Sequence, residues 1–303
     1  MTLGRAPHAG KTQLANRRGL TRRTFLRALA GTGLLGAGTL GYASLIEVHR
    51  LVIERITVPI PGLAERRHNC RIVQLSDLHA GRVALSYIDH ALHVALDLKP
   101  DFLLITGDFV DSEAADVDAL GKTLRPIAAQ VETLGVTGNH DFGIGFRSPA
   151  YADRLCAALS SAGVRMLRND VYVPRAGTGE LAFAGVEDYW SGLARPATLE
   201  KVPADASVIV LAHNPDHYED LDRFRFHLML AGHTHGGQVR LPFVGPPILP
   251  VQHKERAAGL FHLTPAHPER ALYVNRGVGY LRRIRLFCPP EITCITLRNP
   301  ALV

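Results

Sequence analysis

Residues of the types that bind metal ions in proteins follow five short apolar runs of the chain. Asp77 and His79 come after the run 71–75, and Asp108 comes after 101–106. The other groups are Asn139, His140 and Asp141 after 131–137, His213 after 207–212, and His233 and His235 after 227–231. Carboxylate, imidazole and amide donors without a thiolate suit Mn²⁺, Fe²⁺/Fe³⁺ or Zn²⁺. The chemistry expected here is therefore that of a divalent metal site.

The runs that precede these groups are short and rich in Val, Ile and Leu, which is typical of buried strands. In open α/β sheets, ligands bind at the carboxyl ends of the strands, so the five groups are expected to meet at one edge. Asp77 and His79 are two residues apart on an extended segment and should point to one face. The glycines at 107, 138, 232, 236 and 237 allow sharp turns there and leave space around the side chains.

The remaining pattern predicts strands and helices in alternation, followed mainly by strands. Helical periodicity is present over 86–98, 113–129 and 151–162, and the first strand is expected over 50–60. Further strands are predicted at 164–167, 171–173, 181–185, 238–241, 271–275 and 292–297. This order favours two stacked sheets flanked by helices, in one domain that covers residues 47–303.

Taken together, the five blocks resemble the signature of the calcineurin-like metallophosphoesterases. The resemblance implies an α/β (α+β) fold, a four-layer α/β/β/α sandwich of two mixed sheets. It also implies two divalent metal ions that share Asp108. One ion would be bound by Asp77, His79, Asp108 and His235, and the other by Asp108, Asn139, His213 and His233.

The same resemblance implies a phosphoester hydrolase in which two cations hold the phosphoryl group and activate a bridging water to hydroxide. His140 would donate a proton to the leaving oxygen or stabilise the developing charge. Asp141 is expected to orient an imidazole. Four arginines flank the motif loops and either bind the substrate phosphate or remain solvated surface charges: Arg82, Arg147, Arg240 and Arg276.

The charge of the chain is concentrated at its N-terminus. The 303 residues carry a formal charge of +6, but the seven basic residues before Glu47 contribute +7, so residues 47–303 carry −1. A nearly neutral body argues against a nucleic-acid partner. The segment 21–27 (TRRTFLR) resembles the twin-arginine export signal of bacteria, and the run 28–46 is uncharged and contains five glycines.

Residues 1–46 are therefore expected to be an export signal or a membrane anchor, with the twin-arginine machinery as a partner. The site 41–43 only approximates a cleavage sequence, so the protein is either anchored at the extracytoplasmic face or released into the periplasm after cleavage. A cytoplasmic protein with a disordered basic tail is the alternative.

The blocks 232–242 and 275–297 resemble the exported bacterial branch of the family. Some relatives in that branch act on UDP-2,3-diacylglucosamine or on other phosphodiesters of lipids and envelopes. The expected substrate is therefore a lipid-linked or envelope phosphodiester or pyrophosphate. UDP-linked precursors are made in the cytoplasm, which conflicts with export of the domain. The alternatives are a soluble periplasmic phosphodiesterase or monoesterase for small phosphates, and a metal-stabilised envelope-binding module.

Two apolar segments near the motifs would suit a substrate with an acyl chain: residues 142–146, and the pair Tyr189 and Trp190. Tyr189 is also compatible with packing in the core. His217 either approaches the site or lies on a helix surface. The cysteine spacings fit no metal motif. Cys70 and Cys156 are expected to be buried thiols, whereas Cys288 and Cys294 either pair or stay reduced.

Overall fold

The computed structural model of the chain describes residues 21–174 and 180–302. The chain divides into two units, Met1–Gly41 and Tyr42–Val303. The described part of the first unit is the helix α1 (Arg22–Gly41), which begins after Thr21, whose hydroxyl accepts a hydrogen bond from the N–H of Thr24. The helical run Arg22–His49 is long and apolar enough to cross a membrane, and a signal sequence would meet the same criterion.

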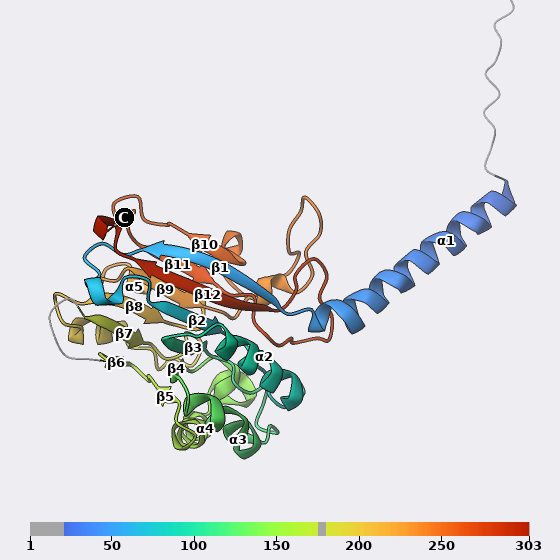
Figure 1. The fold of residues 1–303 in the computed structure, drawn as a ribbon. Helices are drawn as coiled ribbons and strands as arrows, with labels where there is room; N and C mark the ends of the chain where they lie inside the picture. The colour runs from blue at the N-terminus through green and yellow to red at the C-terminus, as the bar shows by residue number, and fades with distance from the viewer. Residues whose placement is uncertain (1–20, 175–179, 303) are drawn as a thin grey trace, which may run out of the picture. The chain divides into compact units, whose positions relative to one another are not determined.

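The second unit contains two six-stranded mixed sheets (Figure 1). The first has the order β1-β12-β2-β3-β4-β5, in which β12 is antiparallel to β2 while β2 to β5 are parallel. The second has the order β10-β11-β9-β8-β7-β6, with antiparallel strands at both edges. The bounds in the first sheet are β1 Val52–Pro59, β2 Arg71–Leu75, β3 Phe102–Thr106, β4 Glu132–Val136, β5 Arg165–Met166 and β12 Glu291–Arg298. Those in the second are β6 Asp170–Tyr172, β7 Leu181–Gly185, β8 Ser207–Leu211, β9 Leu228–Ala231, β10 Gly259–Phe261 and β11 Ala271–Val274.

Alternating side chains of the strands produce the layers of this unit. Val73 and Leu75 of β2 pack against the helices α2 (Leu85–Asp97), α3 (Val117–Ala128) and α4 (Pro149–Ser161). Ile72 of the same strand packs between the two sheets. This alternation arises because successive side chains of a strand point to opposite faces.

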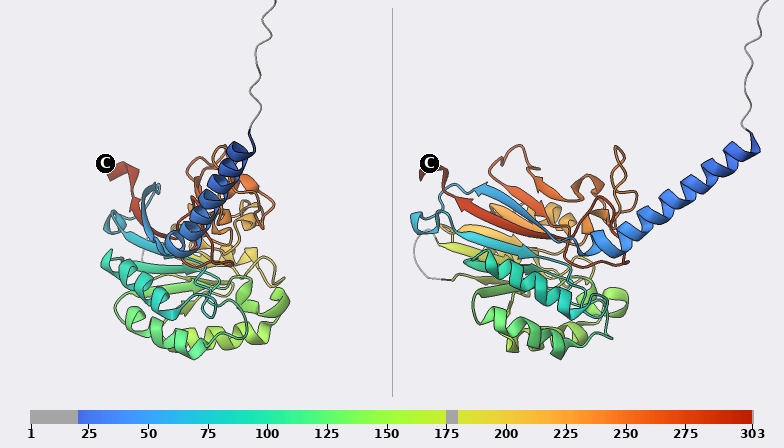
Figure 2. Two further views of the ribbon diagram at one scale, coloured as in Figure 1. Left: turned by 90° about the vertical axis from the view of Figure 1, so that its right-hand side faces the viewer. Right: turned by 45° about the vertical axis from the view of Figure 1, so that its right-hand side comes forward.

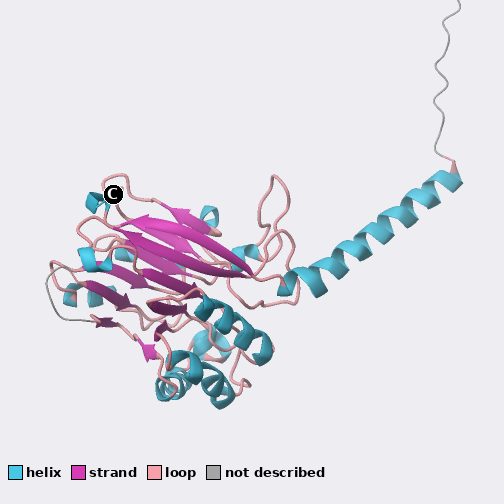
Figure 3. Cartoon of the chain, viewed as in Figure 1, coloured by secondary structure: helices cyan, strands magenta, loops and turns pink. Residues whose placement is uncertain are grey.

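Within the described residues, short helices and loops cover the outer face of the second sheet. Val208 and Val210 of β8 pack with residues of the 3₁₀ helix Pro196–Lys201 and of α5 (Tyr218–Leu221). Figure 3 shows α2, α3 and α4 on the opposite side of the sandwich, below the first sheet. The fold predicted from the sequence, a four-layer sandwich of two mixed sheets, is confirmed.

Two predicted elements differ from the structure. Residues 238–241 form no strand: Val239 makes a single bridge to Leu286, and Gln238 has a φ of 57°, which breaks an extended conformation. The predicted helix 113–129 begins only at Val117, because the Asp116 side chain accepts a hydrogen bond from the N–H of Ala119 and caps the helix there. All four cysteines are buried free thiols, so Cys288 and Cys294 do not pair.

Candidate metal centre

The five blocks meet where strands of both sheets end. Asp77 and His79 follow β2, Asp108 follows β3 and Asn139 follows β4, while the second sheet contributes residues after β8 and β9. All seven predicted ligands are at most 5% exposed: Asp77, His79, Asp108, Asn139, His213, His233 and His235. The structure thus brings together side chains that are up to 158 positions apart in the sequence, from 77 to 235.

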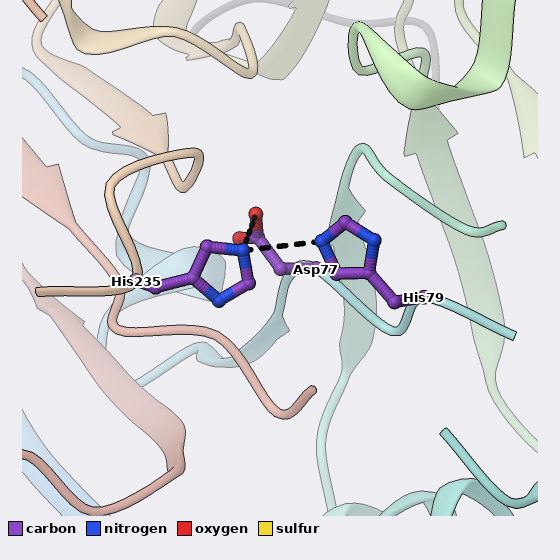
Figure 4. Close-up of side chains that lie close together, drawn as sticks. All are labelled: Asp77, His79 and His235. Carbon is purple, nitrogen blue, oxygen red and sulfur yellow. Dashed lines mark hydrogen bonds and ion pairs between the residues drawn. The ribbon is translucent and has the colours of Figure 1, made fainter. Parts of the chain in front are cut away.

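The first group of ligands is Asp77, His79 and His235, which point toward one another in Figure 4. His235 Nε2 lies 3.4 Å from Asp77 Oδ1 and 3.1 Å from His79 Nε2. Two imidazole nitrogens and a carboxylate oxygen therefore converge on one point, and the group contains neither Lys nor Arg to neutralise the carboxylate. A divalent cation is the partner that this donor set suits.

A second group lies around Asp108. Asp108 Oδ2 is 3.2 Å from His213 Nε2 and 3.6 Å from His79 Nε2, so one oxygen faces ligands of both groups. His233 Nδ1 lies 3.3 Å from His213 Nε2. The buried Oδ1 of Asn139 has no hydrogen-bond partner in the described structure, which is unusual for a buried amide oxygen. A cation would satisfy it, and the residues present therefore fit metal binding.

Backbone carbonyls fix the orientation of two imidazoles. Nδ1 of His213 donates to the carbonyl of Thr106 at 2.7 Å, and Nε2 of His233 donates to the carbonyl of Pro250 at 3.2 Å. The other nitrogen of His213 faces Asp108 Oδ2 at 3.2 Å, and the other nitrogen of His233 faces His213 Nε2 at 3.3 Å. Such outer contacts select the ligating tautomer of a histidine.

The electrostatics of the site also suit cation binding. Burial lowers the pKa of His233 to about 3 and that of His235 well below its ordinary value, so both rings are neutral at neutral pH, as metal ligation requires. Burial also opposes charge on His213, but the nearby Asp108 carboxylate outweighs it and raises the pKa of His213 to about 10. Without a cation, His213 and Asp108 form an ion pair, and metal binding would release that proton.

His140 is partly exposed beside the buried ligands. Its Nδ1 donates to the carbonyl of Asp111 at 2.7 Å, and its backbone N–H donates to Asp108 Oδ1 at 2.9 Å. The ring centroid lies 4.8 Å from that of His79. These contacts hold the ring at the edge of the ligand groups and leave Nε2 available.

Asp141 differs from the expectation that it orients an imidazole. Both of its carboxylate oxygens accept backbone hydrogen bonds, from Val110 at 3.1 Å and from Gly138 at 2.9 Å, so it ties together the loops after β3 and β4. A further acid that contacts an imidazole is Asp111, whose carboxylate lies 3.5 Å from His79 Nδ1. Sequence reasoning missed Asp111 because it stands outside the five blocks.

The four predicted phosphate-binding arginines divide into two pairs. Arg82 is engaged by both oxygens of Asp111, at 2.5 and 2.9 Å. Arg276 contacts Glu54 and the buried Glu291, each at 2.5 Å, so its guanidinium is paired with carboxylates in this structure. Within the described residues, Arg147 and Arg240 form no ion pair.

Aromatic side chains form a rim beside the ligands. The ring of Trp190 lies 4.6 Å from that of His233 and 5.7 Å from that of Phe146, whose ring is 5.1 Å from His140. Phe142 belongs to the segment expected to form this rim, but its side chain is fully buried.

Two neighbouring aromatic residues lie away from the ligands. The ring of Tyr189 packs 4.9 Å from that of His217. His217 is fully buried and contacts the carbonyl of Glu187 at 3.1 Å, so it lies neither on a helix surface nor among the ligands.

A cavity of about 410 Å³ opens beside His233 and His235. Its wall is mainly apolar and includes Val239, Ile248, Pro250, Leu281 and Ile284, and Arg282 also lines it. Its size lies within the range of ligand-binding cavities.

Similarity to known proteins covers nearly the whole chain. A family model described as calcineurin-like phosphoesterase matches residues 70–237. Phosphodiesterase YaeI of Escherichia coli K12 is 35% identical over 280 residues, which is 92% of this chain and 99% of the relative. Uncharacterized metallophosphoesterase YkuE of Bacillus subtilis 168 is 30% identical and covers 92% of this chain and 98% of its own. UDP-2,3-diacylglucosamine pyrophosphatase LpxG of Chlamydia muridarum is 25% identical over 84% of this chain and 91% of the relative.

Proposed function

Because the chain belongs to the calcineurin-like phosphoesterase family, and is thus a metallophosphoesterase, we propose that it hydrolyses a lipid-linked or envelope phosphodiester or pyrophosphate with two divalent metal ions. The observation that carries the proposal is the set of seven buried donors from both sheets, with Asp108 facing two groups of ligands. Asp77, His79, Asp108 and His235 would hold one ion, and Asp108, Asn139, His213 and His233 would hold the other. Mn²⁺, Fe²⁺/Fe³⁺ and Zn²⁺ suit these donors.

When bound, the ions supply Lewis acidity to the phosphoryl oxygens and lower the pKa of water. The chain itself supplies the proton donor. His140 keeps the proton on Nδ1 through its hydrogen bond to the Asp111 carbonyl, so Nε2 is the atom that can carry a second proton toward the leaving oxygen. Asp141 keeps the loops that carry Asp108 and His140 in register.

The apolar cavity beside His233 and His235 supports a lipid-linked substrate. If the phosphate group of a lipid-linked substrate lay at the metal site, the hydrocarbon chain of that substrate would be within reach of Val239, Ile248 and Ile284. Two relatives are named for compatible activities, a phosphodiesterase and a pyrophosphatase for UDP-2,3-diacylglucosamine. Ile248→Asp should raise the KM for a long-chain phosphodiester by about tenfold and leave that for a short-chain ester unchanged, since each methylene in an apolar pocket contributes ~1 kcal/mol.

The apolar helix α1 supports membrane association, as an anchor or as a signal that is removed. We extend the proposal to export through the twin-arginine pathway, with the catalytic unit at the extracytoplasmic face. A reporter enzyme fused after Val303 should be active outside the cytoplasm. In the Arg22→Lys/Arg23→Lys double variant, the reporter should stay in the cytoplasm. Equal export of the reporter by the double variant and by the unsubstituted chain would contradict the twin-arginine route.

The enzyme proposal is tested with the purified full chain loaded with Mn²⁺ and bis-p-nitrophenyl phosphate. We expect His140→Ala to lower kcat by roughly 10²–10⁴-fold while the bound metal content stays unchanged, because only a proton donor is lost. His93→Ala, at an exposed position of α2, is the matched control and should behave as wild type. Equal turnover by the His140→Ala and His93→Ala proteins would favour a metal-stabilised binding module.

A further inference from the structure

An apolar surface of the catalytic unit extends beyond the cavity that the proposed hydrolysis uses. Two segments, 239–250 and 281–287, together form what we call the docking rim. Phe243 and Val244 at the tip of the first segment are 109% and 74% exposed, and Phe287 in the second is 62% exposed. Ile248 (80%) and Leu241 (44%) extend the same apolar surface. Clustered exposed aromatic and aliphatic side chains mark interaction sites on soluble domains.

The docking rim has one sign of charge. Neither segment contains Asp or Glu, and residues 288–290, which follow the second segment, add none. Arg240, Arg282 and Arg283 flank the apolar side chains, and within the described structure none of the three forms an ion pair. Apolar side chains bordered by cations are complementary to the interface of an anionic lipid layer.

Hydrogen bonds hold the two segments of the docking rim together. Arg240 N–H donates to the Leu286 carbonyl, and Leu286 N–H donates to the Gln238 carbonyl, both at 2.9 Å. The side chain of Gln238 donates to the carbonyls of Arg282 and Ile284 at 2.7 Å. The tip is closed by Leu241 and Gly245, whose N–H and carbonyl groups pair with one another at 2.9 Å. The exposed side chains thus stand on a fixed backbone, and Figure 2 shows the orange loop of the first segment extending away from the sheets.

Two further observations relate the docking rim to lipid. The cavity beside His233 and His235 is lined by residues of both segments, including Ile248 and Leu281, so it opens at the rim. The chain enters the catalytic unit at the second segment, where Arg285 N–H donates to the Ala43 carbonyl at 2.9 Å. Leu45 and Ile46, which follow, are 65% and 57% exposed.

We propose that the docking rim binds the surface of an anionic lipid bilayer, with Phe243 and Val244 inserted below the headgroups and Arg240, Arg282 and Arg283 at the phosphates. This contact is separate from any anchoring by α1. It presents the open end of the cavity to the bilayer, so a lipid-linked substrate need not cross water to reach the metal ligands. The contact does not depend on hydrolysis and stands whether or not the proposed reaction is correct.

The test uses the full chain reconstituted in vesicles of phosphatidylcholine and phosphatidylglycerol whose acyl chains carry bromine. In the Trp190→Phe background, Phe243→Trp supplies a single tryptophan at the rim, and Lys122→Trp supplies one on the exposed face of α3. Interfacial side chains lie ~5–10 Å into the acyl boundary, so bromine should quench the Phe243→Trp signal by roughly half or more and leave Lys122→Trp nearly unchanged.

Charge is tested with the same reporter. Arg282→Glu/Arg283→Glu, added to the Phe243→Trp protein, should remove the extra quenching that phosphatidylglycerol produces over phosphatidylcholine alone. Equal quenching of Phe243→Trp and Lys122→Trp would overturn the proposal, as would quenching of Phe243→Trp that is the same with and without anionic lipid. All of these substitutions lie at exposed positions, apart from Trp190→Phe at a partly exposed one, so folding can be checked by circular dichroism.

Discussion

Several metal-ligand candidates have an unusual backbone conformation. Asp77, His79, Asp108, His233 and His235 have φ values between 50° and 69°, in the left-handed region that is uncommon for residues other than Gly, although Asn, Asp and His are enriched there. Such strain persists only where the surrounding structure enforces it, and it is concentrated at functional sites. At the residue scale, the backbone conformation of these residues lowers the free energy of unfolding, and packing of the two sheets must compensate for this loss.

The unsatisfied amide of Asn139 gives a prediction that separates metal binding from folding. Asn139→Leu removes a buried oxygen without a partner, so the metal-free protein should be as stable as wild type within ~1 kcal/mol, or more stable. Metal affinity should fall by about tenfold or more because one ligand is lost. Urea unfolding in chelator and a metal titration measure the two effects. An unchanged affinity would show that Asn139 is not a ligand.

Close packing around Gly232 gives a second residue-scale prediction. A Cβ at this position would lie 1.8 Å from Ser76 Oγ and 2.4 Å from Asp77 Oδ2. Gly232→Ala should therefore displace Asp77, lower the metal content and destabilise the fold by ~1–3 kcal/mol or more. Gly121→Ala in α3 is the control, because its new Cβ makes only ordinary contacts from 3.6 Å and alanine favours a helix by ~1 kcal/mol. Similar Tm shifts in the two variants would contradict this account.

At the scale of elements, the loops that carry the ligands are held by a fully buried arginine. Arg285 has no carboxylate partner and donates instead to backbone carbonyls of His235, Cys288, Arg276, Gly277 and Gly279, at 2.6 to 3.4 Å. It thereby joins the loop after β9, which carries His235, to the loop after β11. Burial lowers its pKa, against the influence of nearby groups. No pattern in the sequence distinguishes Arg285 from its exposed neighbours Arg282 and Arg283.

Replacing this arginine tests its structural role. Arg285→Met keeps an unbranched side chain but leaves buried carbonyls unpaired, which should lower the free energy of unfolding by ~3 kcal/mol or more. Arg283→Met, two residues away and exposed, should change it by less than ~0.5 kcal/mol. Urea titrations of both variants measure the difference, and equal stability would refute the role assigned to Arg285.

The strands were predictable from the sequence because most are buried on both faces and therefore read as continuous apolar runs, as in Phe102–Thr106. The site followed from them, since each ligand block begins where a run ends. Three features could not be predicted, because tertiary contacts determine them. The backbone turns at Gln238, where a strand was expected. Asp111, and not Asp141, lies beside the imidazole of His79. Glu291 forms an ion pair with Arg276.

At the scale of the whole molecule, the formal charge divides into a basic N-terminal segment and a nearly neutral catalytic unit. The catalytic unit concentrates Asp77 and Asp108 in a buried site, where burial raises the pKa of Asp77 and the absence of a cation is unfavourable. Metal binding should therefore stabilise the native state. At a free Mn²⁺ concentration 100 times the dissociation constant, the gain is about 2.7 kcal/mol for one site.

Calorimetry of the full chain with and without a chelator checks this effect. The Tm of the main transition should fall when metal is removed and recover when Mn²⁺ is restored, whereas Asp77→Asn should show a smaller shift. A Tm that does not respond to the chelator would mean that the site contributes no metal-linked stability.

The most direct test of the central claim is the metal content of the purified chain, measured by mass spectrometry together with turnover of bis-p-nitrophenyl phosphate. We expect two divalent ions per active chain. In Asp108→Ala, the loss of a ligand that faces both groups should leave fewer than one ion bound and abolish turnover. Full turnover by a chain that holds one ion or none, or an Asp108→Ala variant that still holds two, would contradict this expectation.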